Sequence, residues 1–118
     1  MTLFRVTIEV GNLQGTRWEP LEALVDTGAT RTKAPRDLLT RLGLTPEDTR
    51  EARLADGRVI QRDVGEARIR LLGKQHTNLI TFGEPGEDPL LGSLTLETFS
   101  LAVDPVNQRL VPVRDMEL

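Results

Sequence analysis

Asp26 follows the apolar residues 23–25 directly and precedes Thr27 and Gly28. Apolar surroundings disfavour the charge of a carboxylate, and glycine lets another group approach the backbone closely. Amide hydrolysis needs both a general acid and a general base, and two carboxylates that share a proton supply both. The chain offers one candidate of this kind, so a two-fold homodimer would provide the second Asp26. The alternative is that Asp26 simply caps a turn, since Asp is common in turns that contain Gly.

Two cations, Arg31 and Lys33, follow this motif in what is predicted to be a half-buried strand. Burying unpaired cations is costly, so three interpretations stay open. The side chains extend to water at the edge of a cleft, or they pair with acidic groups such as Asp56 or Glu84. In the third interpretation, residues 31–34 have been altered in a way that weakens substrate binding or dimer closure. Cations close to Asp26 would also oppose the sharing of a proton.

The segments that must position these residues are predicted to be short strands. Apolar and polar side chains alternate over residues 4–10, which is typical of a strand with one buried face. Pro20 indicates an edge position or a bulge in the next strand. Asp56 and Gly57 predict a tight turn between two extended arms. Further strands are predicted at 16–26, 65–73 and 77–82, and on both sides of a turn at 105–108.

Two segments have the pattern of short helices. Residues 35–43 place three leucines on one stripe and end at Gly43, and residues 93–100 begin at Ser93. Seven or eight short strands with one or two short helices predict an all-β domain, mostly antiparallel and closed or nearly closed like a barrel. The length of 118 residues predicts one domain over 1–118.

Composition argues against several classes of function. Fifteen basic and eighteen acidic residues give a net charge of −3 without a long block of one sign, so neither nucleic acid nor a membrane is expected as a partner. The absence of cysteine excludes a thiol nucleophile and fits a reducing compartment, and no signal peptide is recognised, so a cytoplasmic location is expected. With one histidine, no metal site is expected, and the acidic loop 83–88 is predicted to be solvated.

Several motifs together resemble a known family. LVDTGAT at 24–30 resembles the active-site signature of the aspartic proteases, in particular the retropepsin-like group of single-lobed homodimers related to retroviral proteases. LADGRVI at 54–60 stands where that group carries its flap hairpin. PLLGSLTLE at 89–97 resembles its second landmark, two apolar residues and a glycine before a helix. LAVDPVNQRLVP at 101–112 resembles the terminal strands of bacterial and archaeal members.

The resemblance implies an aspartic endopeptidase that acts on an extended peptide or protein without metal or cofactor. Water activated between two Asp26 carboxylates would attack the peptide bond under the flaps. The alternatives are a catalytically impaired or non-catalytic dimerisation or peptide-binding module of the same fold, and an inert monomer. The implied site consists of Asp26 as catalytic carboxylate, Thr27 bracing the two loops, Gly28 presenting backbone, Ala29, Thr30, Ala55, Asp56 and Gly57 beside the substrate, and Leu90, Leu91 and Gly92 packed behind the loop.

Overall fold

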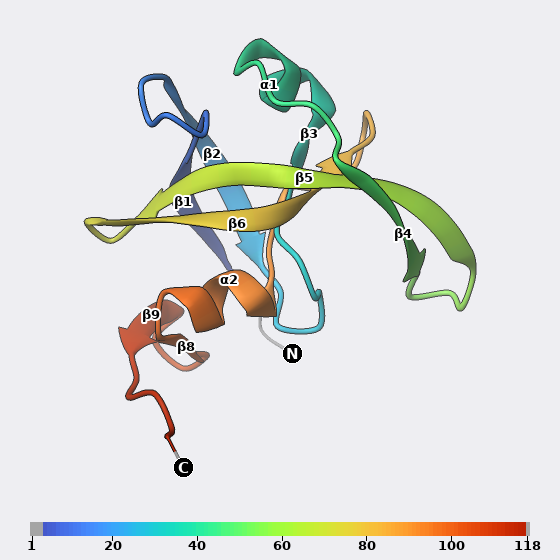
Figure 1. Cartoon of the computed structure of the whole chain (residues 1–118). Coiled ribbons are helices and arrows are strands. Elements are labelled where there is room, and N and C mark those ends of the chain that lie inside the picture. The colour runs from blue at the N-terminus through green and yellow to red at the C-terminus, as the bar shows by residue number, and fades with distance from the viewer. Residues whose placement is uncertain (1–3, 118) are drawn as a thin grey trace.

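The computed structural model describes residues 4–117, and strands dominate it (Figure 1). Two short helices accompany nine strands, so the predicted all-β class with one or two helices is confirmed. The elements in chain order are β1 (Arg5–Gly11), β2 (Trp18–Val25), β3 (Lys33–Pro35), α1 (Arg36–Arg41), β4 (Asp48–Arg53), β5 (Val59–Leu71), β6 (Lys74–Gly83), β7 (Leu90–Leu91), α2 (Ser93–Thr98), β8 (Leu101–Asp104) and β9 (Arg109–Pro112).

Six strands close into a ring. The sheet has the order β1-β2-β7-β3-β6-β5-β4, and an additional pairing of β1 with β5 joins its first strand back to the sheet. Most pairings are antiparallel, whereas β2 with β7 and β3 with β6 are parallel. The predicted closed, mostly antiparallel barrel is therefore confirmed.

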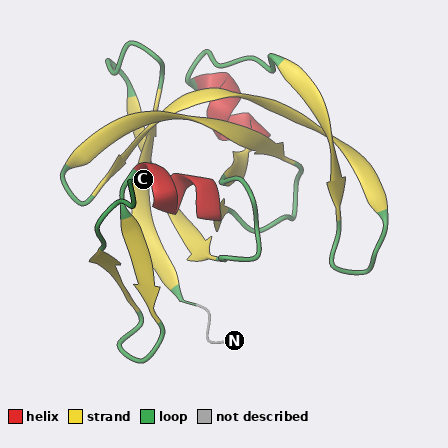
Figure 2. Ribbon diagram, turned by 60° about the horizontal axis from the view of Figure 1, so that its bottom comes forward, coloured by secondary structure: helices red, strands yellow, loops and turns green. Residues whose placement is uncertain are grey.

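The 13-residue strand β5 links the barrel to a projecting hairpin. Its first half pairs with β4 over Val59–Val64, and its second half pairs with β6 and, over Arg68–Arg70, with β1. The side chains of β4 are nearly all exposed, and the β4–β5 hairpin extends beyond the barrel (Figure 2). This hairpin contains the turn that Asp56 and Gly57 predict.

Apolar side chains from the ring strands and α1 fill the barrel. The strict alternation in β1 buries Ile8 and Val10, and α1 contributes Leu38 and Leu39 from its apolar stripe. Gly43 ends this helical segment with a φ of 77°, a conformation that glycine adopts without strain. Neither helix of residues 4–117 has the length and apolar character needed to cross a membrane.

The structure decides between the two interpretations of Pro20 and corrects two other details of the sequence interpretation. β2 runs through Pro20 without a bulge, and Pro20 lies on an open edge because β7 joins β2 only at Leu24 and Val25. The arm predicted after the turn at Asp56 and Gly57 and the strand predicted at 65–73 are one continuous strand, β5. Nine strands replace the expected seven or eight because β3 and β7, of three and two residues, are defined by long-range pairing rather than by a local pattern.

Candidate active site

The loop at residues 26–32, here called the active loop, joins β2 to β3. Its first residue, Asp26, donates its backbone N–H to the carbonyl of Leu91 at 3.1 Å, which continues the parallel pairing of β2 with β7. The N–H of Ala29 donates to the carbonyl of Asp26 at 3.1 Å and closes a turn. The buried strand end and this turn together fix the position from which the Asp26 side chain emerges.

The Asp26 carboxylate is half-buried and held on one side. Its Oδ1 accepts the backbone N–H of Gly28 at 2.9 Å, whereas its Oδ2 has no protein hydrogen bond within residues 4–117. Thr27 and Gly28 are exposed beside it. One oxygen is therefore oriented by the loop, and the other is available to a proton, a water or a second carboxylate.

The segment from β7 into α2 supports the active loop from behind. Ser93 N–H donates to the carbonyl of Ala29 at 2.8 Å, and Leu94 N–H donates to that of Thr30 at 3.0 Å. Gly92 N–H donates to the hydroxyl of Thr32 at 3.1 Å. These bonds place Leu90, Leu91 and Gly92 directly behind the loop, and the loop lies beside the start of α2 (Figure 1).

A buried pair of hydroxyls completes this support. Thr32 and Thr95 are almost fully buried, and their hydroxyl oxygens lie 2.6 Å apart.

Replacing Thr32 by the isosteric valine leaves the Gly92 N–H and the Thr95 hydroxyl unsatisfied. We therefore expect Thr32→Val to lower the free energy of unfolding by about 2 kcal/mol in urea titrations. Thr95→Val should lower the free energy of unfolding by less, because Thr32 still accepts the Gly92 N–H. Equal losses of unfolding free energy in the two variants would contradict this account.

A groove of about 340 Å³ separates the active loop from β4. The active loop contributes Gly28, Ala29, Thr30 and Arg31, and β4 and the residue after it contribute residues 51–54. Among the predicted substrate contacts, Ala55, Asp56 and Gly57 do not line this groove; they are exposed at the turn of the hairpin beyond it. The groove therefore unites part of the sequence-predicted site with β4 residues that were not predicted.

Lys33 is paired, but with an acid that the sequence analysis did not suggest. Its Nζ lies 3.8 Å from a carboxylate oxygen of Glu87. Arg62, whose side chain is almost completely buried, donates to both oxygens of the same carboxylate, one of them at 2.8 Å. One carboxylate thus compensates two cations at the base of the groove.

The partners suggested for the cations were wrong, whereas the loop 83–88 is largely exposed, as predicted, with Glu87 as a half-buried exception. Asp56 pairs with Arg58 in its own turn, and Glu84 pairs with Arg36. Glu84 is exposed, but Glu87 turns inward, and its carboxylate also accepts the Glu84 backbone N–H at 2.8 Å. Glu87 therefore serves as a half-buried counter-charge for Lys33 and Arg62.

The ion pair between Arg62 and Glu87 affects the protonation of the Glu87 carboxyl. Hydrogen bonds from Arg62 lower the pKa of the Glu87 carboxyl from its usual 4.5 to about 2, although burial acts in the opposite direction. The Glu84 N–H and the positive charges of Lys33 and Arg62 add to the lowering of this pKa. Because the pKa is depressed in the folded state, the ionised carboxylate stabilises the fold above about pH 4.5, and this stabilisation is lost as the pH falls through about 2.

Glu87→Gln is expected to destabilise the protein by about 2 kcal/mol at pH 7, because it leaves Arg62 buried without an anionic partner. Chemical unfolding from pH 7 to pH 2 should show a smaller loss of stability on acidification in the variant than in the parent protein. Asp88→Asn is the control, since Asp88 lies in the same loop and makes only an exposed 3.5 Å contact with Arg5. An equal effect of the two substitutions would contradict the proposed role of the buried pair.

Arg31 differs from Lys33 because no carboxylate of residues 4–117 lies within ion-pairing distance of it. Its Nε is buried and makes no hydrogen bond. The nearby Asp48 is engaged by Arg50 at 2.7 Å, and Arg31 contributes only the weakest of several effects that lower the pKa of Asp48. Arg31 thus lines the groove without an ion-pair partner among residues 4–117.

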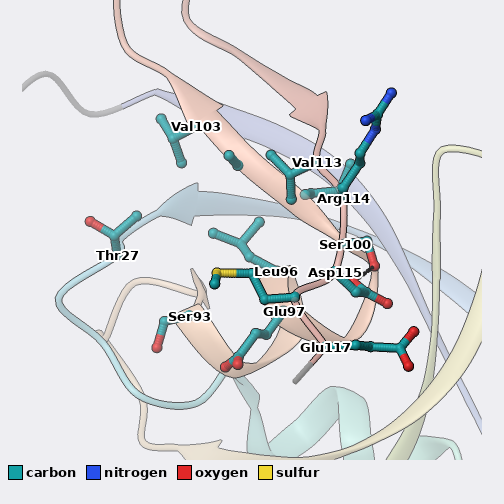
Figure 3. A pocket seen from close by; sticks show the side chains of 13 residues that line it. Thr27, Ser93, Leu96, Glu97, Ser100, Val103, Val113, Arg114, Asp115 and Glu117 are labelled. Atoms are coloured by element: carbon teal, nitrogen blue, oxygen red, sulfur yellow. Dashed lines mark hydrogen bonds between the residues drawn. The ribbon is translucent and has the colours of Figure 1, made fainter.

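A second hollow, of about 940 Å³, begins on the other side of the active loop. Thr27 and Ser93 lie along one side of it, and Leu96, Val103 and Val113 are among the side chains drawn around it (Figure 3). Apolar side chains from α2, β8 and the segment after β9 form part of its wall, and polar or charged residues, among them Glu97, Arg114, Asp115 and Glu117, form the rest. We call this hollow the apolar face; its apolar residues are Leu96, Leu101, Ala102, Val103, Val113 and Met116.

Sequence reasoning missed several of these residues for an identifiable reason. Arg62 and Glu87 are 25 positions apart, and no local pattern connects them. Residues 51–54 could have been found from the predicted hairpin, because its first arm runs opposite the active loop. Within the described residues, no group of three or more His, Cys, Asp or Glu side chains is arranged to bind a metal ion.

Comparison with known proteins gives two kinds of match. A family model described as aspartyl protease matches residues 6–94, well over half of the chain. Among solved structures, the EIAV protease complexed with the inhibitor HBY-793 has 16% identity and a TM-score of 0.57, with 92% of this chain and 91% of that chain covered. The retroviral protease-like domain of Ddi1 from Leishmania major has 15% identity and a TM-score of 0.57, with 92% and 87% covered. The search of curated proteins gives no match.

Proposed function

Because the chain belongs to the aspartyl protease family and has the retropepsin-like fold, we propose that it is an endopeptidase that cleaves extended peptides as a homodimer. In the proposed mechanism two Asp26 side chains share one proton. The ionised carboxylate takes a proton from water, and the protonated partner donates a hydrogen bond to the carbonyl under attack. The reaction then passes through no covalent intermediate with the enzyme.

The geometry of Asp26 carries this proposal. Its Oδ1 is oriented by the Gly28 N–H, and its Oδ2 has no protein partner among the described residues. The hydrogen bonds to β7 and α2 hold the loop rigidly, which is what a catalytic carboxylate needs to keep its position within a few tenths of an ångström. The active loop supplies one carboxylate per chain, so the acid and the base together require two chains.

The proposed partner is a second copy docked on the apolar face. Thr27 is exposed at the border between the active loop and this face, so a two-fold axis nearby would bring two Thr27 side chains and two Asp26 side chains together. Val113 and Met116 are both large, apolar and exposed on this face. Covering them with a second copy would remove apolar surface from water, which favours association.

The proposed substrate is a peptide in an extended conformation, which lies in the groove between the active loop and β4. Ala29 and Thr30 would border its main chain from one side, and the exposed turn with Ala55, Asp56 and Gly57 would cover it from the other. Gly57 has a φ of 91°, and the position that a Cβ would take lies in open space, which suits a turn that must change position as a peptide enters.

Cleavage of a peptide library tests the proposal directly. The full-length protein is incubated at pH 4 to 7 with a library of mixed peptides, and new termini are identified by mass spectrometry. We expect cleavage that a transition-state mimic with a hydroxyl in place of the scissile amide inhibits. Binding of extended peptides without any new termini would instead indicate a peptide-binding module of the same fold.

Val113→Asp tests the position of the dimer interface. An aspartate buried at an apolar interface would lose its hydration, so we expect the dimer dissociation constant to rise at least about tenfold. Sedimentation at several concentrations measures this constant. Val106→Asp is the matched control, since Val106 is 87% exposed in the β8–β9 turn, outside the apolar face. If the two variants dimerise equally well, the second copy docks elsewhere.

A further inference from the structure

The groove between the active loop and β4 has an unusual charge for this protein. The chain as a whole carries a net charge of −3, yet four basic side chains line the groove, and Glu51 is the only acidic residue among its lining residues. We propose that this groove selects substrates with an Asp or Glu side chain close to the cleaved bond. This inference rests on the proposed protease function and names the substrate class of the same site.

The positive charges of two of the four cations, Arg62 and Lys33, are compensated in part by the carboxylate of Glu87. Glu87 accepts hydrogen bonds from Arg62 and lies 3.8 Å from Lys33, so its single negative charge serves both. The Lys33 contact is longer than a hydrogen bond, so the ammonium group keeps donors for another acceptor. The base of the groove therefore retains positive charge after this pairing is counted.

The other two cations have no carboxylate partner. Arg31 has its Nε buried without a hydrogen bond, and Arg53 donates one Nη1 hydrogen bond to the carbonyl of Gly57 at 3.1 Å. Neither forms an ion pair within residues 4–117. A guanidinium presents five donors in a fixed fork that matches a carboxylate, so both side chains are suited to bind one.

The groove also has apolar walls for the stem of such a side chain. Ala52 and Leu54 lie on the β4 side, and Leu90 lies on the barrel side. A glutamate could pack its methylene groups against them and place its carboxylate beside Arg31 and Lys33. An apolar substrate side chain would instead displace water from these cations without replacing its hydrogen bonds, which is unfavourable. Glu51 is exposed and reduces the positive charge of the groove without balancing it.

The experiment compares peptide pairs in cleavage and in binding. Each fluorescein-labelled decapeptide carries one glutamate at a varied position in a neutral sequence, and its partner carries glutamine there. The wild-type protein is assayed for cleavage, and the Asp26→Asn variant is assayed for binding by anisotropy. At one or two positions we expect glutamate to improve cleavage and binding about tenfold over glutamine, with a preference that weakens as salt is added.

Substitutions then assign the preference to the groove. Arg31→Gln should remove most of the glutamate preference, and Arg31→Glu should reverse it in favour of lysine at the same position. Lys74→Gln is the control, because Lys74 pairs with Leu71 at the end of β5 opposite to the hairpin. Circular dichroism and thermal unfolding confirm that each variant is folded.

The two readouts separate failure of this inference from failure of the proposed function. Binding with a glutamate preference but no cleavage by the wild type would support the acidic groove and overturn proteolysis. Cleavage without that preference would support proteolysis and overturn the acidic groove. An equal preference in Arg31→Gln and in the wild type would also overturn the role of this groove.

Discussion

Replacing Asp26 by asparagine is expected to reduce peptide cleavage by at least about 10⁴-fold, because each subunit loses the group that acts as acid or base. Asparagine has the same shape, and its amide oxygen can still accept the Gly28 N–H that Asp26 Oδ1 accepts at 2.9 Å. The fold and the dimer should therefore be retained. Initial rates of cleavage, sedimentation and thermal unfolding measure these three properties in the same preparation.

Mixing the variant with wild-type protein tests whether the two carboxylates act as one unit. If both subunits must supply Asp26, heterodimers are inactive, and activity falls with the square of the wild-type fraction after the subunits have exchanged. If each Asp26 acted independently, a heterodimer would keep half of the activity, and activity would fall in proportion to the wild-type fraction. A linear decrease, or full activity of the pure variant, would contradict the shared-proton mechanism.

Gly92→Ala is expected to lower the free energy of unfolding by about 3 kcal/mol and to abolish cleavage, because overpacking against backbone forces the chain to move. A Cβ at this position would lie 2.5 Å from the Arg31 carbonyl carbon, 2.6 Å from its oxygen and 2.9 Å from the Thr32 nitrogen. All three atoms belong to the backbone of the active loop, so no side chain can rotate away. The displacement would also disturb the hydrogen bond between Gly92 and Thr32 that holds the loop.

Ser93→Ala is the matched control for this prediction. Ser93 is the next residue and only half-buried, and its side chain makes no hydrogen bond within the described residues. We expect a change in unfolding free energy below about 0.5 kcal/mol and normal cleavage. If urea unfolding shows the same stability for both variants, the contact between β7 and the active loop is looser than the structure indicates.

Features that depend on neighbouring residues could be predicted from the sequence. Alternation over residues 4–10 identified β1 because successive side chains of a strand point to opposite faces. Gly43 and the leucines before it identified α1, and Asp56 with Gly57 identified the hairpin turn. The segment 24–30 identified the family because its apolar lead-in, carboxylate and glycine are consecutive in the chain.

The tertiary structure decided everything that depends on contacts between distant residues. Closure of the barrel rests on the pairing of β1 with β5, about 60 positions apart, and the counter-charge for Lys33 comes from Glu87, 54 positions away. The groove exists because β4 crosses opposite the active loop. Arg31 lacks a partner because the fold places no carboxylate of residues 4–117 within ion-pairing distance of it. Local patterns report which face of an element is apolar, but they contain no information about which other element will meet it, since that follows from the packing of the whole chain.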